Sequence, residues 1–299
     1  MDTILIQRFE LLGLAVMMAW LTSLVAWKLD FFHSEFPYFK PPPSVQLENV
    51  CAIFVLFLAI QLLFVPLLAW AFFSFRAGHL IYDPSSLKIS SLEQGWLNLL
   101  AIFVTFTGLL LFFLWQSPAK KRLILWGGKP GGWLRASKDF KVGAATWLVS
   151  YPLVLVLSQI IGIFAYYIGP PTPVDQVAVK HLKMTMGSPL LFYCTAIVIV
   201  IIVPITEELL FRGFLQRWFV TIFNRFWGIV LTACFFALFH FSFSQSWENI
   251  ELLLSLFILA CFLGYLYERQ GSLWAPIGLH MVFNSISVFF IIFEGVSKS

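Results

Sequence analysis

Residues 190–213 read LLFYCTAIVIVIIVPITEELLFRG, and they carry an apolar run directly into two adjacent acids, Glu207 and Glu208. No turn signal separates the two parts of the stretch. Ionisable groups at membrane depth are energetically expensive, so they normally face a cavity or a partner. The stretch predicts a helix that either continues through the acids or restarts at a cap on Thr206.

The composition of the whole chain indicates what surrounds this stretch. Of its 299 residues, 60% are hydrophobic and only 11% are charged, whereas soluble domains carry about 25% charged residues. A soluble fold cannot bury so much apolar surface, but a bilayer accommodates it. The net charge of +4 is small, and no basic run is typical of nucleic-acid binding, so we expect no nucleic-acid partner.

The fold class predicted is all-α, a polytopic membrane helix bundle of about eight transmembrane helices. A spanning helix needs roughly 20 mostly apolar residues, and the hydrocarbon offers no water to backbone groups, so each span is expected to be helical. The apolar segments are about 11–27, 50–75, 96–115, 142–168, 189–205, 226–243, 250–267 and 275–293.

The loop 116–141 gives the strongest topology signal. It carries seven Lys and Arg residues against one acid, Asp139, and positive residues favour the cytoplasmic side. Placing this loop inside also places 28–49, 206–225 and 268–274 inside, and these four loops hold most of the Lys and Arg. We expect both termini outside, in a multi-pass integral protein of the plasma (inner) membrane.

The two acids have different partners available on a helix. Glu208 and Arg212 are four residues apart, so they face each other, and Glu before Arg is the favourable order. Glu207 lies about 100° away around the helix, which leaves it less firmly paired and makes it the better general base. Taken alone, the stretch is equally explained by an interfacial helix start with acids near the positive end of the helix dipole.

His240 shares one helical face with Phe236 in the next apolar segment. A lone His in an apolar helix is usually a packing residue. The midpoint between Glu207 and His240, however, falls at Asn224–Arg225, the most polar break between the two helices. Residues equally far from an antiparallel turn lie at about the same depth, so Glu207 and His240 are predicted to meet across the hairpin.

His280 and Asn284 in the last segment are also four residues apart and share one face. This pattern indicates either a polar cavity or hydrogen bonds that join helices. A straight span at 250–267 would leave His280 roughly 10 Å from the level of His240, by the rise of a helix. That span must be tilted, broken or short if the two side chains are to meet.

Together these residue types can form a site that activates water. Glu207 would take a proton with the help of His240, and His280 and Asn284 would donate hydrogen bonds to a developing oxyanion. Glu207, His240 and His280 are also possible zinc ligands. The HExxH helix of zinc proteases is absent from the sequence, so we expect no cofactor.

The three elements resemble the CPBP family of intramembrane proteases, also called the Abi or CAAX prenyl protease type II-like family. The family pattern is E-E-x-x-x-R, then F-x-x-x-H, then H-x-x-x-N or D. The sequence has all three in order, as Glu207-Glu208-x-x-x-Arg212, Phe236-x-x-x-His240 and His280-x-x-x-Asn284. Residues 264–276, GYLYERQGSLWAP, also resemble the family's lead into its last element.

The resemblance covers about 190–290 and implies an endopeptidase that hydrolyses peptide bonds in or near the membrane. The implied partners are a membrane-associated protein or peptide substrate and the lipid bilayer. We divide the chain into N-terminal transmembrane helices and loops, 1–188, and a CPBP-like catalytic core, 189–294. The implied catalytic residues are Glu207, His240, His280 and Asn284, and the site-shaping residues are Glu208, Arg212 and Phe236.

Two other functions remain open from the sequence. A CPBP-like membrane protein without catalytic activity would use the same fold to bind peptides or confer self-immunity. A proton-coupled transporter would use Glu207 and His240 as a relay, because intramembrane acids also mark proton paths.

Overall fold

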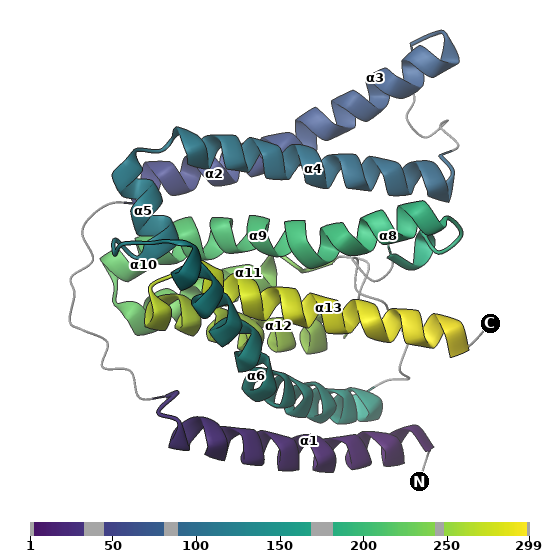
Figure 1. The fold of residues 1–299 in the computed structure, drawn as a ribbon. Helices are drawn as coiled ribbons and strands as arrows, with labels where there is room; N and C mark the ends of the chain where they lie inside the picture. Colours follow the sequence, from purple (N-terminus) through teal and green to yellow (C-terminus); the bar gives the residue numbers. More distant parts are fainter. Residues whose placement is uncertain (1–2, 33–44, 81–88, 169–181, 243–247, 298–299) are drawn as a thin grey trace.

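The computed structural model describes residues 3–32, 45–80, 89–168, 182–242 and 248–297, and every regular element in these ranges is a helix. The predicted all-α helix bundle is confirmed, and Figure 1 shows most of its helices running side by side. The α-helices are α1 (Thr3–Lys28), α2 (Leu47–Ala59), α3 (Val65–Ala77), α4 (Ser91–Trp115), α5 (Pro118–Trp126), α6 (Trp133–Ile168), α8 (Pro189–Ile197), α9 (Val203–Glu208), α10 (Arg217–Ile222), α11 (Arg225–Leu238), α12 (Glu248–Gln270) and α13 (Trp274–Ser297). Within the described ranges, three π-helical segments interrupt them: η1 (Ile60–Phe64), η3 (Val198–Ile202) and η4 (Leu209–Gln216).

Seven helical stretches in the described ranges are long and apolar enough to cross a membrane. They are Thr3–Lys28, Leu47–Ala77, Ser91–Trp115, Trp133–Tyr167, Pro189–Ile222, Asn249–Gln270 and Trp274–Phe293. The predicted segment 226–243 differs, because its helix α11 has only 14 residues, fewer than the roughly 20 that a span needs. The segment expected to end at 205 instead continues as helix to Ile222.

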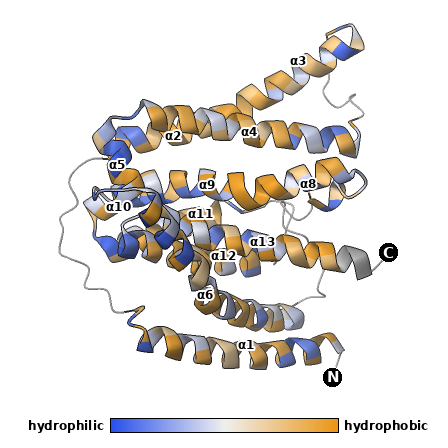
Figure 2. Ribbon diagram, viewed as in Figure 1, coloured by the Kyte–Doolittle hydropathy of each residue, from blue (hydrophilic) through white to orange (hydrophobic). Residues whose placement is uncertain are grey.

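The outward-facing side chains are apolar over most of the molecule, as expected where a surface meets lipid. Large exposed examples are Leu63, Phe75, Phe164 and Leu190. Figure 2 shows hydrophobic residues along the lengths of the helices and hydrophilic residues gathered mainly near their ends. The chain is a multi-pass integral membrane protein.

The loop 116–141 contains a helix, α5, that was not predicted from the sequence. Its first turn is capped by Ser117, whose Oγ accepts from the Lys120 N–H at 3.4 Å, and Gly127 ends it with a left-handed φ of 58°. The carbonyl of Leu125 accepts from the Leu273 N–H at 3.1 Å. This bond ties α5 to the turn that leads into α13.

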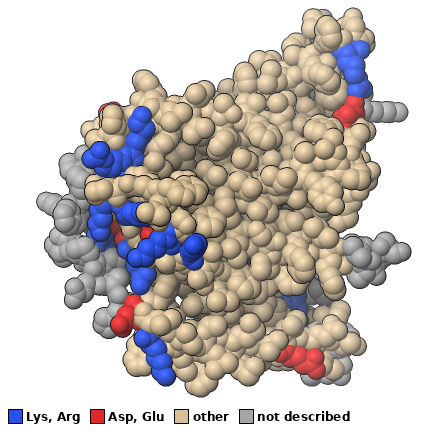
Figure 3. All heavy atoms as spheres, viewed as in Figure 1, with Lys and Arg blue, Asp and Glu red and all other residues tan. Residues whose placement is uncertain are grey.

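Basic side chains gather at the end of the molecule where α5 and the start of α6 lie (Figure 3). The first residues of α1 and the last residues of α13 lie at the opposite end (Figure 1). The arrangement agrees with placing both termini on one side and the loop 116–141 on the other. Seven crossings alone would separate the termini, but the short helix α11 turns the chain back between α10 and α12. Which side is cytoplasmic stays a prediction.

Two glycines bring α6 and α13 together next to His280. A Cβ added at Gly143 would overlap the carbonyl oxygen of Ala275, and one added at Gly278 would overlap the carbonyl oxygen of Phe140. Small residues permit this close approach of helices in membranes. The crossing therefore sets the position of the first turns of α13, from which His280 projects.

We expect Gly143→Ala to lower the melting temperature of the protein in detergent, because the added methyl group would overlap backbone of α13. Overpacking of this kind usually costs about 1–3 kcal/mol. The matched control is Gly13→Ala, since nothing lies within 4 Å of a Cβ at Gly13. Equal melting temperatures for the two variants would show that the α6–α13 contact is not tight.

The predicted topology is tested by single cysteines at Lys121 and Lys138 in a background that lacks the native cysteines. An impermeant thiol reagent should label both only from the cytoplasmic side, because the basic end of a membrane protein stays inside. A cysteine at Ser91, which begins α4 at the other end, should be labelled from outside. Labelling of the first two positions in intact cells would reverse the topology.

Candidate active site

The two adjacent acids lie in the middle of a long irregular helix. α8, η3, α9, η4 and α10 follow one another without a break from Pro189 to Ile222. Thr206 does not cap a new helix, because its Oγ1 donates to the carbonyl of Ile202 at 2.7 Å. The span therefore continues through Glu207 and Glu208, and π-helical segments lie on both sides of α9. Such segments are frequent at functional sites.

Glu208 and Arg212 form the predicted ion pair. Arg212 donates to Glu208 Oε1 at 3.1 Å, and both side chains have 0% exposure. A second guanidinium nitrogen donates to the carbonyl of Ala260 on α12 at 3.1 Å. The guanidinium also lies over the ring of Phe236, 4.6 Å from its centroid. Three helices thus meet around this one cation.

Glu207 lies opposite His240, as predicted from their equal distances along the chain to the turn at Asn224–Arg225. Glu207 Oε1 is 3.8 Å from His240 Nε2, and the side chains keep 22% and 31% exposure respectively. His240 Nδ1 lies 2.9 Å from the carbonyl of Phe236, which only accepts, so Nδ1 carries the proton and Nε2 faces the carboxylate. The separation from Glu207 is longer than a direct hydrogen bond.

His280 joins the two acids. Its Nδ1 is 2.8 Å from Glu208 Oε1, and its Nε2 is 3.7 Å from Glu207 Oε2. Because a carboxylate oxygen accepts, Nδ1–H donates to Glu208. The contact with Glu208 was not predicted, since the sequence assigned His280 only to a developing oxyanion. The contact to Glu207 brings a second imidazole to the proposed base.

The sequence predicted different depths for His240 and His280 if the span between them were straight. The two side chains nevertheless meet, although α12 is neither broken nor short. This helix is continuous over its 23 residues, from Glu248 to Gln270. α11, by contrast, ends at Leu238, so His240 lies just beyond it. The two imidazoles contact the same ring, with centroids 4.9 Å and 5.9 Å from that of Phe236. Two of the three routes predicted from the sequence, a break in α12 and a short α12, are therefore wrong.

Asn284 shares the His280 face of α13 but reaches a different group. Its Nδ2 donates to the carbonyl of Ile199 in η3 at 2.9 Å. This is a bond between helices, the second of the two interpretations that the sequence left open. One N–H of the amide remains, and its role toward an oxyanion stays a prediction.

Sequence reasoning missed a polar extension of the site. Gln216 continues the four-residue spacing of Glu208 and Arg212, is fully buried, and donates to Glu268 Oε1 at 3.0 Å. The neighbouring Arg217 donates to the hydroxyl of Tyr267 at 2.8 Å. The regular spacing was the signal available in the sequence.

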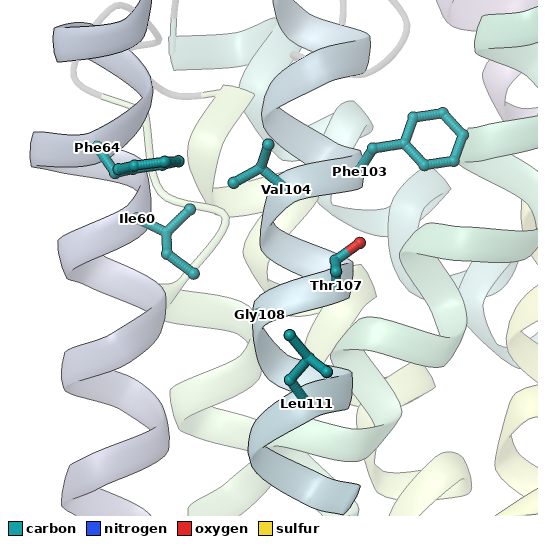
Figure 4. Close-up of a pocket in the computed structure, with 7 residues that line it drawn as sticks. All are labelled: Ile60, Phe64, Phe103, Val104, Thr107, Gly108 and Leu111. Atoms are coloured by element: carbon teal, nitrogen blue, oxygen red, sulfur yellow. The ribbon is translucent and has the colours of Figure 1, made fainter.

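The acids and imidazoles do not form a metal-binding group in the ranges that the structure covers, since no three His, Cys, Asp or Glu side chains there have suitable geometry. The expectation of no cofactor stays a prediction. A separate crevice of about 460 Å³ lies between α4 and η1 (Figure 4) and is lined by Ile60, Phe64, Phe103, Val104, Thr107, Gly108 and Leu111. None of the predicted site residues lines it.

The fold and this cluster define a class of protein: a polytopic helical membrane protein with paired acids, two His and an Asn gathered in its C-terminal half. Comparison with protein families gives a match to the type II CAAX prenyl endopeptidase Rce1-like model over residues 189–286. The match supports the CAAX protease family that the motifs predicted, and the matched segment contains every residue of the cluster. Neither the curated proteins nor the solved structures contain a match to the chain.

Proposed function

We propose that the chain is an intramembrane endopeptidase that hydrolyses a membrane-associated protein or peptide with water activated by Glu207 and His240. The observation that carries the proposal is the asymmetry of the two adjacent acids. Glu208 is neutralised by Arg212, while Glu207 keeps partial exposure and lies within 4 Å of two imidazoles. The match of residues 189–286 to the Rce1-like model supports a protease function.

The geometry supports a general-base mechanism. Glu207 takes a proton from water while the water oxygen bonds to the carbonyl carbon of the substrate, whose oxygen becomes an oxyanion. When the tetrahedral intermediate collapses, the C–N bond breaks, and the proton that Glu207 took from water passes to the leaving amine, either directly or through His240 Nε2. Glu207 Oε2 accepts no hydrogen bond from any residue in the described ranges, so it has capacity to accept one from water.

Glu208, Arg212 and Phe236 shape the site in this proposal. Their contacts hold His280 and fix the face of the helix on which Glu207 projects. The resemblance assigns oxyanion stabilisation to His280 and Asn284. For His280 this requires a proton on Nε2 in addition to the one on Nδ1, so the imidazole would act in its charged form, balanced by the two nearby carboxylates.

Glu207→Gln should abolish cleavage of a quenched membrane-proximal peptide and leave the melting temperature near that of wild type. The change is nearly isosteric and removes a base rather than a structural partner. Glu208→Gln should also lower stability, because breaking one member of a buried pair typically costs about 3–5 kcal/mol. Combining Glu208→Gln with Arg212→Gln should recover part of the stability but not full activity.

Measuring turnover and melting temperature for the wild type and these three variants distinguishes the possible outcomes. Substantial turnover in Glu207→Gln, with a stable but inactive Glu208→Gln, would exchange the roles of the two acids. Activity in both single variants would remove the hydrolase proposal. If the wild type cleaves no peptide in a broad library, a binding or transport function is favoured instead.

Metal dependence is tested by extensive chelation with phenanthroline or EDTA. We expect turnover to survive, because no three His, Cys, Asp or Glu side chains in the described ranges are arranged to hold a metal ion and the sequence has no HExxH helix. Inactivation that stoichiometric zinc reverses would identify Glu207, His240 and His280 as ligands. A zinc peptidase with a known HExxH helix serves as the positive control for chelation.

A further inference from the structure

The helix that carries the acids has a carbonyl without a helical partner. In an α-helix the Ile199 carbonyl would accept from residue 203, and in a π-helix it would accept from residue 204. The Val203 N–H instead donates to the Val198 carbonyl, and residue 204 is proline, which has no N–H. An unsatisfied carbonyl in a membrane interior is costly, and the Asn284 amide supplies the missing donor at 2.9 Å.

The identity of the contacting atom follows from the chemistry of the bond. A backbone carbonyl oxygen only accepts, so the Asn284 atom that faces Ile199 must be the amide nitrogen. Asn284 therefore has one N–H committed to backbone before any substrate arrives.

A second bond joins the same two helices nearby. His280, one turn before Asn284 on α13, bonds Glu208 at 2.8 Å. The pairs Ile199–Asn284 and Glu208–His280 are two points of attachment along one antiparallel contact. Two hydrogen-bonded points restrict sliding and rotation of one helix against the other more than a single point does. The separation of 3.7 Å between Glu207 and His280 depends on that register.

We infer that Asn284 is a positioning residue: its amide replaces the helix hydrogen bond that Pro204 removes, and it thereby holds Glu207 in register with His280. The inference rests on the proposed function for its effect on turnover, but the bond itself is independent of activity. It differs from a role at the oxyanion, in which Asn284 would touch the reacting atoms.

A double-mutant cycle between Asn284 and Pro204 tests the inference. Asn284→Leu should lower kcat by about 100-fold, the scale of a misplacement of about 1 Å, with little change in KM. Pro204→Ala returns an N–H that can serve Ile199, so the double variant should recover most of the lost kcat. Ser285→Ala, an exposed change on the same helix, is the matched control.

Melting temperatures of the same proteins test the bond whether or not the protein cleaves peptides. Asn284→Leu should lower the melting temperature more with Pro204 present than with Pro204→Ala. Equal losses of stability and of kcat in both backgrounds would overturn the inference and favour direct contact with the oxyanion. Coupling in melting with no coupling in kcat would limit Asn284 to a structural role and also overturn it.

The pH–rate profile decides the matter if Pro204→Ala is itself inactive. The charged and titratable groups around Glu207 are His240, His280, Glu208 and Arg212. If Asn284→Leu displaces Glu207 from them, the acidic limb of the profile moves. Loss of an oxyanion donor instead lowers the plateau and leaves the limb in place. Failure of the inference leaves the proposed function intact so long as Glu207→Gln is inactive and wild type is active.

Discussion

The buried ion pair of Glu208 and Arg212 is the interaction on which the rest of the C-terminal half depends. Both side chains are inaccessible, and an unpaired charge at membrane depth is strongly unfavourable. The pair is completed by groups from three further helices: the carbonyl of Ala260, the ring of Phe236 and the imidazole of His280. Assembly of α11, α12 and α13 around this pair is thus required for the charge to be buried.

The same pair explains how two adjacent carboxylates can differ in chemistry. Successive helical residues project about 100° apart, so only Glu208 points at Arg212. Glu207 turns toward His240 and His280 and keeps some access. A site with one neutralised acid and one available acid avoids two competing negative charges. His280 contacts both acids, so the structural pair and the proposed base are linked through one ring.

Local spacing predicted the parts of this site that depend on one helix or one hairpin. The Glu208–Arg212 pair follows from a separation of four residues, and the approach of Glu207 to His240 follows from their equal distance to the Asn224 turn. The Glu208–His280 bond could not be predicted in this way. It depends on how α13 lies against the acid-bearing helix, which the α6–α13 glycine contact helps to determine.

Element boundaries were less predictable, for identifiable reasons. Apolar periodicity predicted a segment that stops at 205, whereas the helix continues to Ile222 because most of the polar residues beyond Thr206, namely Glu208, Arg212, Gln216 and Arg217, are buried in the bundle. The same apolar pattern overestimated the length of α11, which ends before His240. α5 escaped notice although Ser117, Pro118 and Gly127 are typical boundary residues, since a helix of nine residues is too short to span.

The irregular helix and the polar cluster depend on each other. In a bilayer, a carbonyl released by a proline or a π-helical turn needs a donor from the protein. Such donors are polar side chains, which are themselves tolerated only among other polar groups. Pro204, Ile199 and Asn284 satisfy these requirements together, and Ile199 lies about two helical turns before Glu207. A regular α-helix would need no Asn284 at this position, and an apolar α13 could not accommodate the irregular one.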